Sequence, residues 1–272
     1  MSLDSGEFSL PDDSHIYINK IIERCENLIH YGIWSGIDTT RLHRWLCNFN
    51  DGEEKYFAAC ILDALIYRSE DQTIALIRQL FQRTLPDLNR SDPMPISPIV
   101  DWKDSLIKCN QYRDPGIRLV VAVKSSDPPT KSAHVVARYM KRNLSINERW
   151  IIKPVEMENQ IKHGIKVFLF IDDFLGTGNQ FSTLITSEKL SQFLSSIYAA
   201  YIPLTAHKEG INNLRDKFNN LRVTAVEILD DTHSLFHKNC NCFKDGKNNH
   251  ISAREFYCNL LKVKNINIKT DL

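Results

Sequence analysis

The sequence lacks a long apolar run and any marked excess of one charge. None of its hydrophobic stretches approaches the about 20 residues of a membrane-spanning helix, and its first fifteen residues, MSLDSGEFSLPDDSH, are too polar and acidic for a secretory signal peptide. With 34 basic and 33 acidic residues, the formal net charge is only +1. No global field therefore attracts nucleic acid or anionic lipid, and we predict a cytoplasmic protein that does not associate with membranes.

The sequence also lacks a recognisable disulfide or zinc-finger framework. Thiols stay reduced in the cytoplasm, so the seven cysteines are predicted to be free. Six potential metal ligands lie toward the end of the chain, namely His233, His237, Cys240, Cys242, His250 and Cys258. Because Cys240 and Cys242 are separated by one residue rather than roughly two to four, they fit no common zinc motif. An ordinary polar tail is the favoured interpretation, with a structural metal as the alternative.

The first part of the chain shows only the periodicity of helices. Residues 15–29 place apolar side chains three and four positions apart, which predicts an amphipathic helix. Asp51 and Glu54 form a capping-box pattern, and a second helix is expected over residues 53–67. The same spacing recurs over residues 74–81 and predicts a third helix.

A proline-rich stretch closes this helical part. We expect the third helix to end before Pro86, and we interpret residues 86–98, with four prolines, as a linker or a turn-rich boundary. This predicts a separate helical module over residues 1–90 that packs on the rest of the chain or on a partner. The aromatic residues expected to be exposed as anchors for such a partner are Trp34, Trp45 and Phe49.

After this stretch the pattern changes to that of a doubly wound sheet. Apolar runs predict strands at residues 118–123, 151–155, 167–171, 197–202 and 223–229. The runs are continuous rather than alternating, which is typical of parallel strands buried on both faces. Helical patterns lie between them, at residues 133–144, 181–194 and 211–218. We therefore predict an α/β domain with a mainly parallel, doubly wound sheet over residues 91–232, followed by an extension, 233–272, whose structure the pattern does not indicate.

The loop that says most about function follows the strand at 167–171. Asp172 and Asp173 leave this strand and are followed, before a helix, by Gly176, Thr177, Gly178, Asn179 and Gln180. Glycines let backbone N–H groups approach an anion, and the helix N-terminus favours negative charge. A ribose phosphate suits both halves of the loop, because its hydroxyls donate to the carboxylates while its phosphate lies among the amides. A structural turn and a methyltransferase glycine-rich loop are the alternatives, whereas a P-loop is excluded because no Lys-Ser/Thr follows the glycines.

This pattern resembles the signature of type I phosphoribosyltransferases, in which an apolar strand leads to an acidic pair, three variable residues and Thr-Gly. The acidic pair here is Asp172 and Asp173, and Thr-Gly is Thr177 and Gly178. The resemblance implies a phosphoribosyltransferase-like fold. It also implies that the acidic pair contacts the ribose hydroxyls of phosphoribosyl pyrophosphate and that the loop amides bind the 5′-phosphate. At the next two positions, Asn-Gln departs from the signature, which usually has Gly followed by Thr or Ser.

The resemblance further implies a pyrophosphate-binding loop after the strand at 118–123. The segment KSSDPPTKSA lies there and offers the donors Lys124, Ser125, Ser126, Thr130, Lys131 and Ser132. Its position matches that loop, but its sequence is not close to the commoner versions, so pyrophosphate binding and an ordinary turn both stay open. The implied cofactor is Mg²⁺, carried by the ligand and not by a side-chain cluster. Asp230 and Asp231, after the last strand, are either base-recognition residues or a strand-end turn.

A narrower resemblance concerns the front end together with this loop. The segments WSGIDTTRLHRWLCNFNDGEEKYFAACILDAL and IDDFLGTGNQF are similar to phosphoribosyltransferase-like effectors of bacterial conflict systems, some of which accompany retron reverse transcriptases. This implies a glycosyl-transfer enzyme that acts on phosphoribosyl pyrophosphate or a related nucleotide in anti-phage defence. A reverse transcriptase with its nucleic acid would be the restraining partner. The alternatives are a catalytically inactive nucleotide-binding regulator and a partner-docking module with the same fold.

Overall fold

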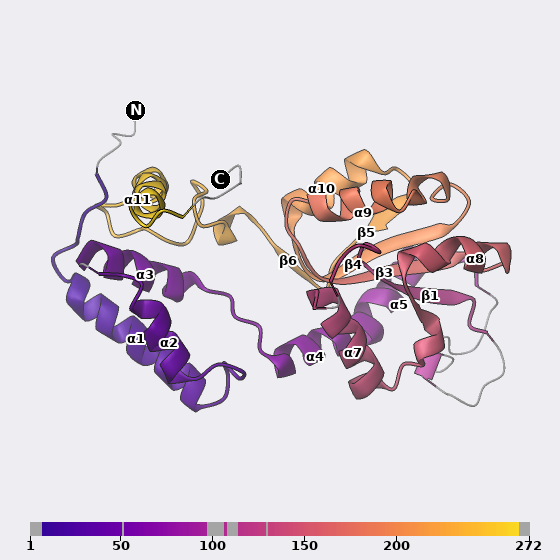
Figure 1. Ribbon diagram of the computed structural model, residues 1–272, viewed down its shortest axis with the longest axis horizontal. Coiled ribbons are helices and arrows are strands. Elements are labelled where there is room, and N and C mark those ends of the chain that lie inside the picture. Colours follow the sequence, from indigo (N-terminus) through magenta and orange to yellow (C-terminus); the bar gives the residue numbers. More distant parts are fainter. Residues whose placement is uncertain (1–6, 51, 97–105, 108–113, 129, 267–272) are drawn as a thin grey trace. The chain divides into compact units, whose positions relative to one another are not determined.

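The computed structural model describes residues 7–50, 52–96, 106–107, 114–128 and 130–266 (Figure 1). The chain divides into two units. The first, which we call the helical unit, joins Met1–Glu70 to Asp230–Leu272, and the second, the sheet unit, is Asp71–Leu229. These limits differ from the boundaries expected at residues 90 and 232, chiefly because the helices after residue 70 belong with the sheet.

The helices of the helical unit come from both ends of the sequence. They are α1 (Ser14–His30), α2 (Thr39–Leu46), α3 (Gly52–Ala64) and α11 (His250–Val263). The periodicity over residues 15–29 and 53–67 closely matches α1 and α3, whereas α11 lies in the extension whose structure the sequence pattern does not indicate. Asp51, the expected capping residue of α3, lies outside the described residues.

The C-terminal segment completes the core of the helical unit. The ring of Phe57 in α3 stacks on Phe243 with centroids 5.6 Å apart and on Tyr257 of α11 at 5.9 Å. The ring of Phe8 stacks on Phe256 at 4.6 Å. Short amphipathic helices bury only a modest core by themselves, so these contacts supply the cover that the apolar faces of α1 and α3 need.

One of the expected docking residues belongs to this interior. Trp34 is only 7% exposed, and its ring centroid lies 5.4 Å from that of Tyr67. The prediction of an exposed anchor is therefore wrong for Trp34, which lies in the turn between α1 and α2 and packs within the unit. Trp45 and Phe49 are half-buried, and their rings contact each other at a centroid distance of 4.9 Å.

The sheet unit contains a six-stranded sheet in which every pairing is parallel. Its order is β2-β1-β3-β4-β5, and β6 also pairs with β4. The strands are β1 (Ile117–Val121), β2 (Ile151–Ile152), β3 (Val167–Leu175), β4 (Tyr198–His207), β5 (Leu221–Val223) and β6 (Glu227–Leu229). The predicted parallel α/β architecture is confirmed. Two details differ: β2 stops before Pro154, which begins a 3₁₀ turn, and residues 224–226 separate β5 from β6.

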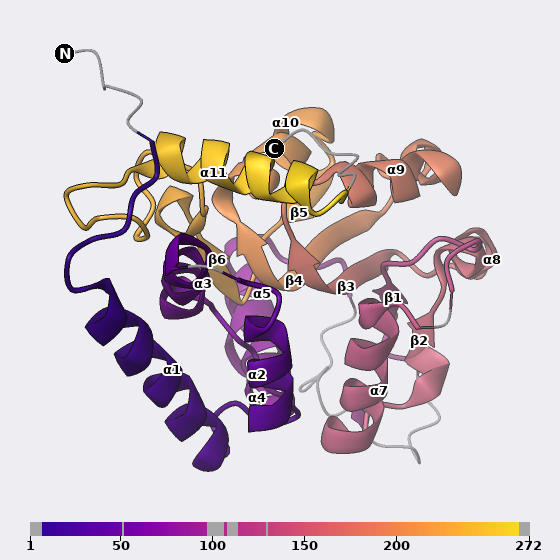
Figure 2. The ribbon, with the colours of Figure 1, turned by 60° about the vertical axis from the view of Figure 1, so that its left-hand side comes forward.

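Helices cover both faces of this sheet (Figure 2). They are α4 (Glu70–Gln79), α5 (Leu85–Ser91), α7 (Ser132–Leu144), α8 (Met157–Lys162), α9 (Asn179–Ser187) and α10 (Lys208–Lys217). Phe168 and Phe170 of β3 lie in one buried cluster with α9 and α10, whereas Leu169 and Ile171 lie in another with α5 and α7. Because β3 is buried on both faces, its sequence is a continuous apolar run.

The helical pattern does not end at Pro86, contrary to the sequence prediction. A π-helical stretch, Leu80–Thr84, links α4 to α5, and Pro86 lies in the first turn of α5. Proline cannot donate an N–H to the preceding turn, and the π-helical stretch just before it is where the regular i→i−4 hydrogen-bond pattern is already interrupted. Part of the expected linker is thus helical, and residues 97–98 of it lie outside the described residues. Ile77, Leu80 and Leu85 are fully buried against the sheet, which explains the position of the unit boundary.

Two further findings concern the chain as a whole. Among the described residues, no helix has the length and apolar character needed to cross a membrane. The six cysteines in the described ranges are free, whereas Cys109 lies outside them. Cys25, Cys60, Cys240 and Cys242 are buried.

Candidate functional site

The acidic pair lies within the carboxyl-terminal end of the central strand. β3 continues through both residues to Leu175, and Asp172 pairs with Pro203 of β4. Successive side chains on a strand point to opposite faces, and the two carboxylates accordingly have different partners. Tyr201 Oη donates to Asp172 Oδ2 at 2.9 Å, and Ser132 Oγ at the start of α7 donates to Asp173 Oδ1 at 2.9 Å.

Asp172 has the more unusual environment of the two. Part of its side chain faces a pocket, and the phenol of Tyr201 forms much of its other surroundings. The ring of Phe181 stacks on that of Tyr201 with the ring centroids 3.8 Å apart. Burial, reinforced by the nearby carboxylate of Asp173, raises the pKa of Asp172 to about 8. In the ligand-free protein Asp172 therefore retains, at neutral pH, a proton that an exposed carboxyl group would have lost.

The glycine-rich loop connects this strand end to the N-terminus of α9. Gly178 adopts a left-handed conformation with φ 91° just before the helix begins at Asn179. The first N–H groups of a helix have no acceptor within it, and the helix dipole adds partial positive charge at that end. Residues 176–180 thus bring the start of α9 close to the two carboxylates.

Strand end and loop line a common pocket of about 290 Å³, which we call the acidic-pair pocket. Its lining residues are Ser132, Asp172, Asp173, Phe174, Leu175, Gly176, Thr177, Gly178, Asn179, Gln180, Phe181 and Tyr201. The structure therefore brings together all seven residues of the predicted acidic pair and phosphate loop. Tyr201 and Phe181 were not identified from the sequence, because their role depends on packing across β4 and α9.

Helix α10 holds the loop in place from behind. A Cβ atom on Gly210 would lie 1.9 Å from the carbonyl oxygen of Gly176, so only glycine permits this approach. Asn213 Nδ2 donates to the carbonyl oxygen of Thr177 at 3.1 Å. Neither residue stands out in the sequence, although a glycine in the first turn of a helix that follows a long strand is a signal of close packing.

The predicted pyrophosphate-binding residues have a different arrangement. None of Lys124, Ser125, Ser126, Thr130 or Lys131 lines the acidic-pair pocket, whereas their neighbour Ser132 does. The backbone N–H and the hydroxyl of Ser125 both donate to the carboxylate of Glu188, at 2.6 and 3.0 Å.

The rest of this segment is also held by a carboxylate. Asp127 accepts from the backbone N–H of Lys124 at 2.9 Å and pairs with Lys131 Nζ at 3.2 Å. Glu188 follows the last residue of α9, a helix of 9 residues that begins at the phosphate loop. The length of this helix, about 13 Å, therefore separates Glu188 from the phosphate loop. The backbone N–H of Lys124, both donors of Ser125 and the ammonium of Lys131 are thus satisfied by the protein's own carboxylates.

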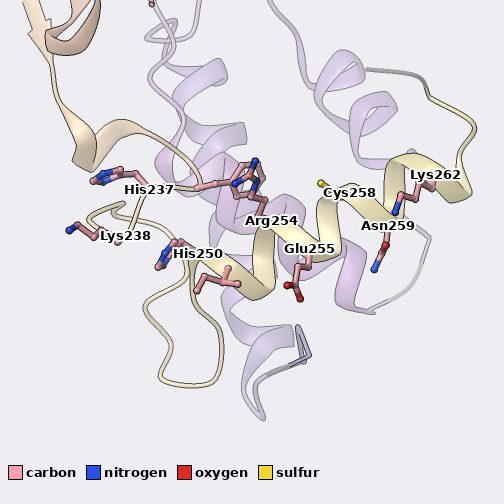
Figure 3. A pocket seen from close by; sticks show the side chains of 10 residues that line it. His237, Lys238, His250, Arg254, Glu255, Cys258, Asn259 and Lys262 are labelled. Carbon is pink, nitrogen blue, oxygen red and sulfur yellow. The ribbon is translucent and has the colours of Figure 1, made fainter. Parts of the chain in front are cut away.

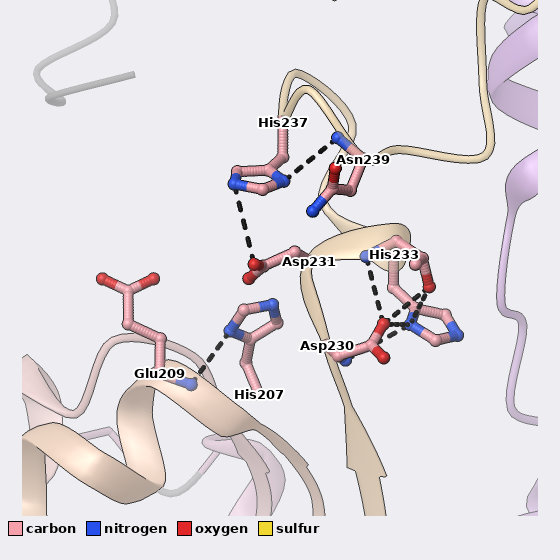
Figure 4. Close-up of polar contacts among 8 residues, drawn as sticks. His207, Glu209, Asp230, Asp231, His233, His237 and Asn239 are labelled. Carbon is pink, nitrogen blue, oxygen red and sulfur yellow. Dashed lines mark hydrogen bonds and ion pairs between the residues drawn. The ribbon is translucent and has the colours of Figure 1, made fainter.

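The carboxylates after the last strand form a turn (Figure 4). Asp230 accepts from the backbone N–H of Thr232 at 3.0 Å, and it contacts Nδ1 of His233 at 3.0 Å. Hydrogen bonds from Thr232, first from its hydroxyl, lower the pKa of Asp230. Asp230 is therefore the cap of a 3₁₀ turn, Asp231–His233. No set of three or more His, Cys, Asp or Glu side chains able to hold a metal ion occurs in the described ranges.

Comparisons with known proteins complete the description of the site. The model of the PRTase-CE family matches residues 42–271 of the chain, which include β3, the acidic pair and the phosphate loop. No curated protein and no solved structure matches the chain significantly.

Proposed function

The chain belongs to the PRTase-CE family of phosphoribosyltransferase-like conflict effectors, and on that premise we propose that it binds a ribose 5-phosphate compound in the acidic-pair pocket and transfers the ribosyl group. The ligand would be phosphoribosyl pyrophosphate or a related nucleotide. One observation carries this proposal: the acidic pair and the residues at the start of α9 line the same pocket of about 290 Å³.

In this pocket the two ends of the ligand would meet complementary groups. Its phosphate would lie among the amides of residues 176–180, and its hydroxyls would donate to Asp172 and Asp173. Donors to both carboxylates favour their ionised forms, so binding would release the proton that Asp172 holds. Cleavage at C1 of the ribose develops positive charge, which a preorganised negative pair stabilises. Positioning and charge therefore account for the catalysis without a protein nucleophile.

Mg²⁺ is the proposed cofactor, and the donor set fits an ion that is held mainly by the ligand. The acidic pair offers Asp173, which already accepts from Ser132, and Asp172, whose pKa of about 8 makes it a poor ligand in the free protein. Mg²⁺ prefers oxygen ligands and is commonly bound by one or two carboxylates together with substrate phosphates. When bound, the ion would neutralise charge on the departing pyrophosphate.

We extend the proposal to an effector role in anti-phage defence in the cytoplasm. Membership of a conflict-effector family supports a harmful activity that a partner restrains. The proposed partner is a retron-type reverse transcriptase with its nucleic acid. Expression of the chain without this partner should arrest growth, and co-expression should relieve the arrest. Growth arrest that the partner does not relieve would contradict the restraint, whereas no arrest in either case would contradict the effector role.

The second candidate function is nucleotide binding without transfer. It is favoured by the position of Ser125, whose two donors bind Glu188 instead of facing the acidic-pair pocket. A regulator of this kind would bind ribose 5-phosphate compounds through residues 176–180 but would release no pyrophosphate. Incubation with phosphoribosyl pyrophosphate, Mg²⁺ and a mixture of nucleobase and nucleoside acceptors, followed by a pyrophosphate assay, separates the two functions.

The central test is titration calorimetry with ribose 5-phosphate and with phosphoribosyl pyrophosphate plus Mg²⁺. We compare the wild type with an Asp172→Asn, Asp173→Asn double variant, which keeps similar shapes but removes the charges. The proposal expects binding by the wild type and at least tenfold weaker binding by the double variant at an unchanged fold. Equal affinities of the wild type and the double variant would contradict the proposed function. A matched control is Asp216→Asn, because Asp216 is an exposed carboxylate of α10 outside the pocket.

A further inference from the structure

The charges of the helical unit are unevenly distributed along its sequence. Residues 7–70 contain eleven acidic and six basic side chains, counted as Asp and Glu against Lys and Arg. Residues 238–264 contain two acidic side chains and six basic ones, namely Lys238, Lys244, Lys247, Arg254, Lys262 and Lys264. The small net charge of the whole chain thus conceals a basic segment.

Some of these cations have a structural role within the unit. Lys247 Nζ pairs with Asp12 at 2.8 Å, and Lys264 Nζ pairs with Glu54 at 3.0 Å. Both pairs join the basic C-terminal segment to the acidic N-terminal one. In contrast, Lys238, Arg254 and Lys262 form no ion pair with any part of the chain that the structure describes.

Lys238, Arg254 and Lys262 line one pocket, which we call the α11 pocket (Figure 3). It has a volume of about 790 Å³, and its lining residues are Phe236, His237, Lys238, His250, Ile251, Arg254, Glu255, Cys258, Asn259 and Lys262. Glu255 is the one acidic residue among them. Uncompensated positive charge in a concave site attracts an anionic ligand.

The layout of the pocket indicates an extended ligand. His250, Arg254, Cys258 and Lys262 follow one another at four-residue intervals and so form one stripe along α11. The stripe from position 250 to 262 is about 18 Å long at the rise of an α-helix, which is too long for a single nucleotide. The half-buried residues Phe236 and Ile251 add apolar surface beside the cations.

We propose that the α11 pocket binds a short segment of single-stranded nucleic acid. Such ligands combine backbone phosphates, which basic side chains neutralise, with base faces that pack on aromatic and apolar surface. Lys238, Arg254 and Lys262 would contact phosphates, and a base would pack against Phe236. The site lies wholly within the helical unit and does not depend on the acidic-pair pocket.

Fluorescence anisotropy with a labelled twelve-residue oligo(dT) and the full-length chain tests this site. About three phosphate contacts predict that the affinity falls roughly 20-fold between 50 and 200 mM salt. The variant Arg254→Glu with Lys262→Glu should bind at least tenfold more weakly and should show a smaller salt dependence. The control is Lys20→Glu with Lys55→Glu, which makes the same charge change at exposed helical positions outside the α11 pocket; circular dichroism checks that both variants are folded.

The remaining outcomes decide between ligands. Equal binding by the pocket variant and the control variant would overturn the proposal. A poly-glutamate peptide of the same charge is tested as a competitor for the site; if it competed as effectively as unlabelled oligo(dT), the ligand would be an acidic peptide and the proposal of nucleic acid would be overturned. Full competition by thymidine monophosphate at a similar concentration would show that a single nucleotide fills the site, and it would overturn the proposal of an extended ligand. Asp172→Asn with Asp173→Asn should leave oligonucleotide binding unchanged, so failure of the proposed function is distinguishable from failure of this site.

Discussion

The loops that follow β1 and β3 leave the same edge of the sheet and are both rich in anion donors, but they differ in how far the protein's own carboxylates bind these donors. We call the loop after β3 the open loop and the loop after β1 the closed loop. After β3, the residues at the start of α9 line a pocket. After β1, Ser125 is bound by Glu188, and Lys131 is bound by Asp127. A donor-rich sequence is therefore a candidate anion site only where the protein's own carboxylates do not already satisfy the donors.

The largest expected effect comes from the contact that shapes the open loop. The Cβ of Gly210→Ala would lie 1.9 Å from the carbonyl oxygen of Gly176, so the loop has to move by more than 1 Å. We expect ribose 5-phosphate to bind on the order of 100-fold more weakly and the free energy of unfolding to fall by about 1–3 kcal/mol. Calorimetry and chemical denaturation measure the two effects. Lys208→Ala, at an exposed position of the same helix, should change neither, and wild-type affinity in Gly210→Ala would show that α10 does not shape the loop.

The second prediction concerns Asp172, the half-buried acid beside the open loop. The pKa of Asp172 is about 8 in the folded protein and about 4 when unfolded. The folded state therefore retains a proton that the unfolded state loses, and stability falls as pH rises from about 4 to 8 and is then constant. Asp172→Asn removes this dependence and should raise stability at pH 8 relative to wild type, by on the order of 4–5 kcal/mol for the full shift of the pKa, with little difference near pH 4. Urea denaturation across this range measures it; parallel pH profiles would contradict a buried, protonated Asp172.

The same group makes a prediction for binding. Ribose hydroxyls favour ionised carboxylates, so the affinity of the wild type for ribose 5-phosphate should increase about tenfold between pH 7 and 9 as the proton leaves Asp172. The phosphate is already fully charged over most of this range. Asp172→Asn should bind weakly at both pH values without this increase, and calorimetry at several pH values provides the measurement.

A smaller effect is expected from the closed loop. Glu188→Gln weakens the acceptor that holds both donors of Ser125, so pyrophosphate should bind about fivefold more tightly to the variant. Ribose 5-phosphate, which needs only the loop after β3, should bind as to wild type. Glu156→Gln, elsewhere in the sheet unit, is the matched control. Unchanged pyrophosphate affinity would mean that Glu188 does not compete with an anion at this loop.

The smallest effect is predicted for the link between the two loops. Ser132 Oγ donates to Asp173 at 2.9 Å from the start of α7, and a hydrogen bond to a charged acceptor contributes about 1 kcal/mol or somewhat more. Ser132→Ala should weaken ribose 5-phosphate binding about threefold to fivefold by leaving Asp173 less well oriented. Ser126→Ala, in the same segment but outside the pocket, should have no effect, and equal losses in both variants would contradict the orienting role.

Local sequence patterns predicted the open loop well and its surroundings poorly. Strand, acidic pair, glycines and helix start are consecutive between Val167 and Asn179, so composition and spacing suffice to identify them. Contacts such as Tyr201 with Asp172, or Ser125 with Glu188, join residues 29 and 63 positions apart. No periodicity encodes such pairs, because they arise only when the strands and helices are packed.

The division into units was hard to predict for the same reason. Helical spacing over residues 74–81 is the same whether the helix packs on other helices or on a sheet, and the expected boundary at residue 90 followed from prolines alone. The structure instead buries Ile77 and Leu80 on the sheet. A fragment beginning at Ser91 would expose that face of the sheet, whereas one spanning Asp71–Leu229 keeps it covered.

The sheet unit is inserted between the two parts of the helical unit, and this arrangement has a consequence for the order of folding during synthesis. Residues 7–70 leave the ribosome first, but the rings of Phe8 and Phe57 lack Phe243, Phe256 and Tyr257 until the segment after Asp230 has followed. The sheet unit is complete earlier, and domains fold as units once their chain is available. The segment that precedes the sheet unit is thus synthesised before it but finishes folding after it.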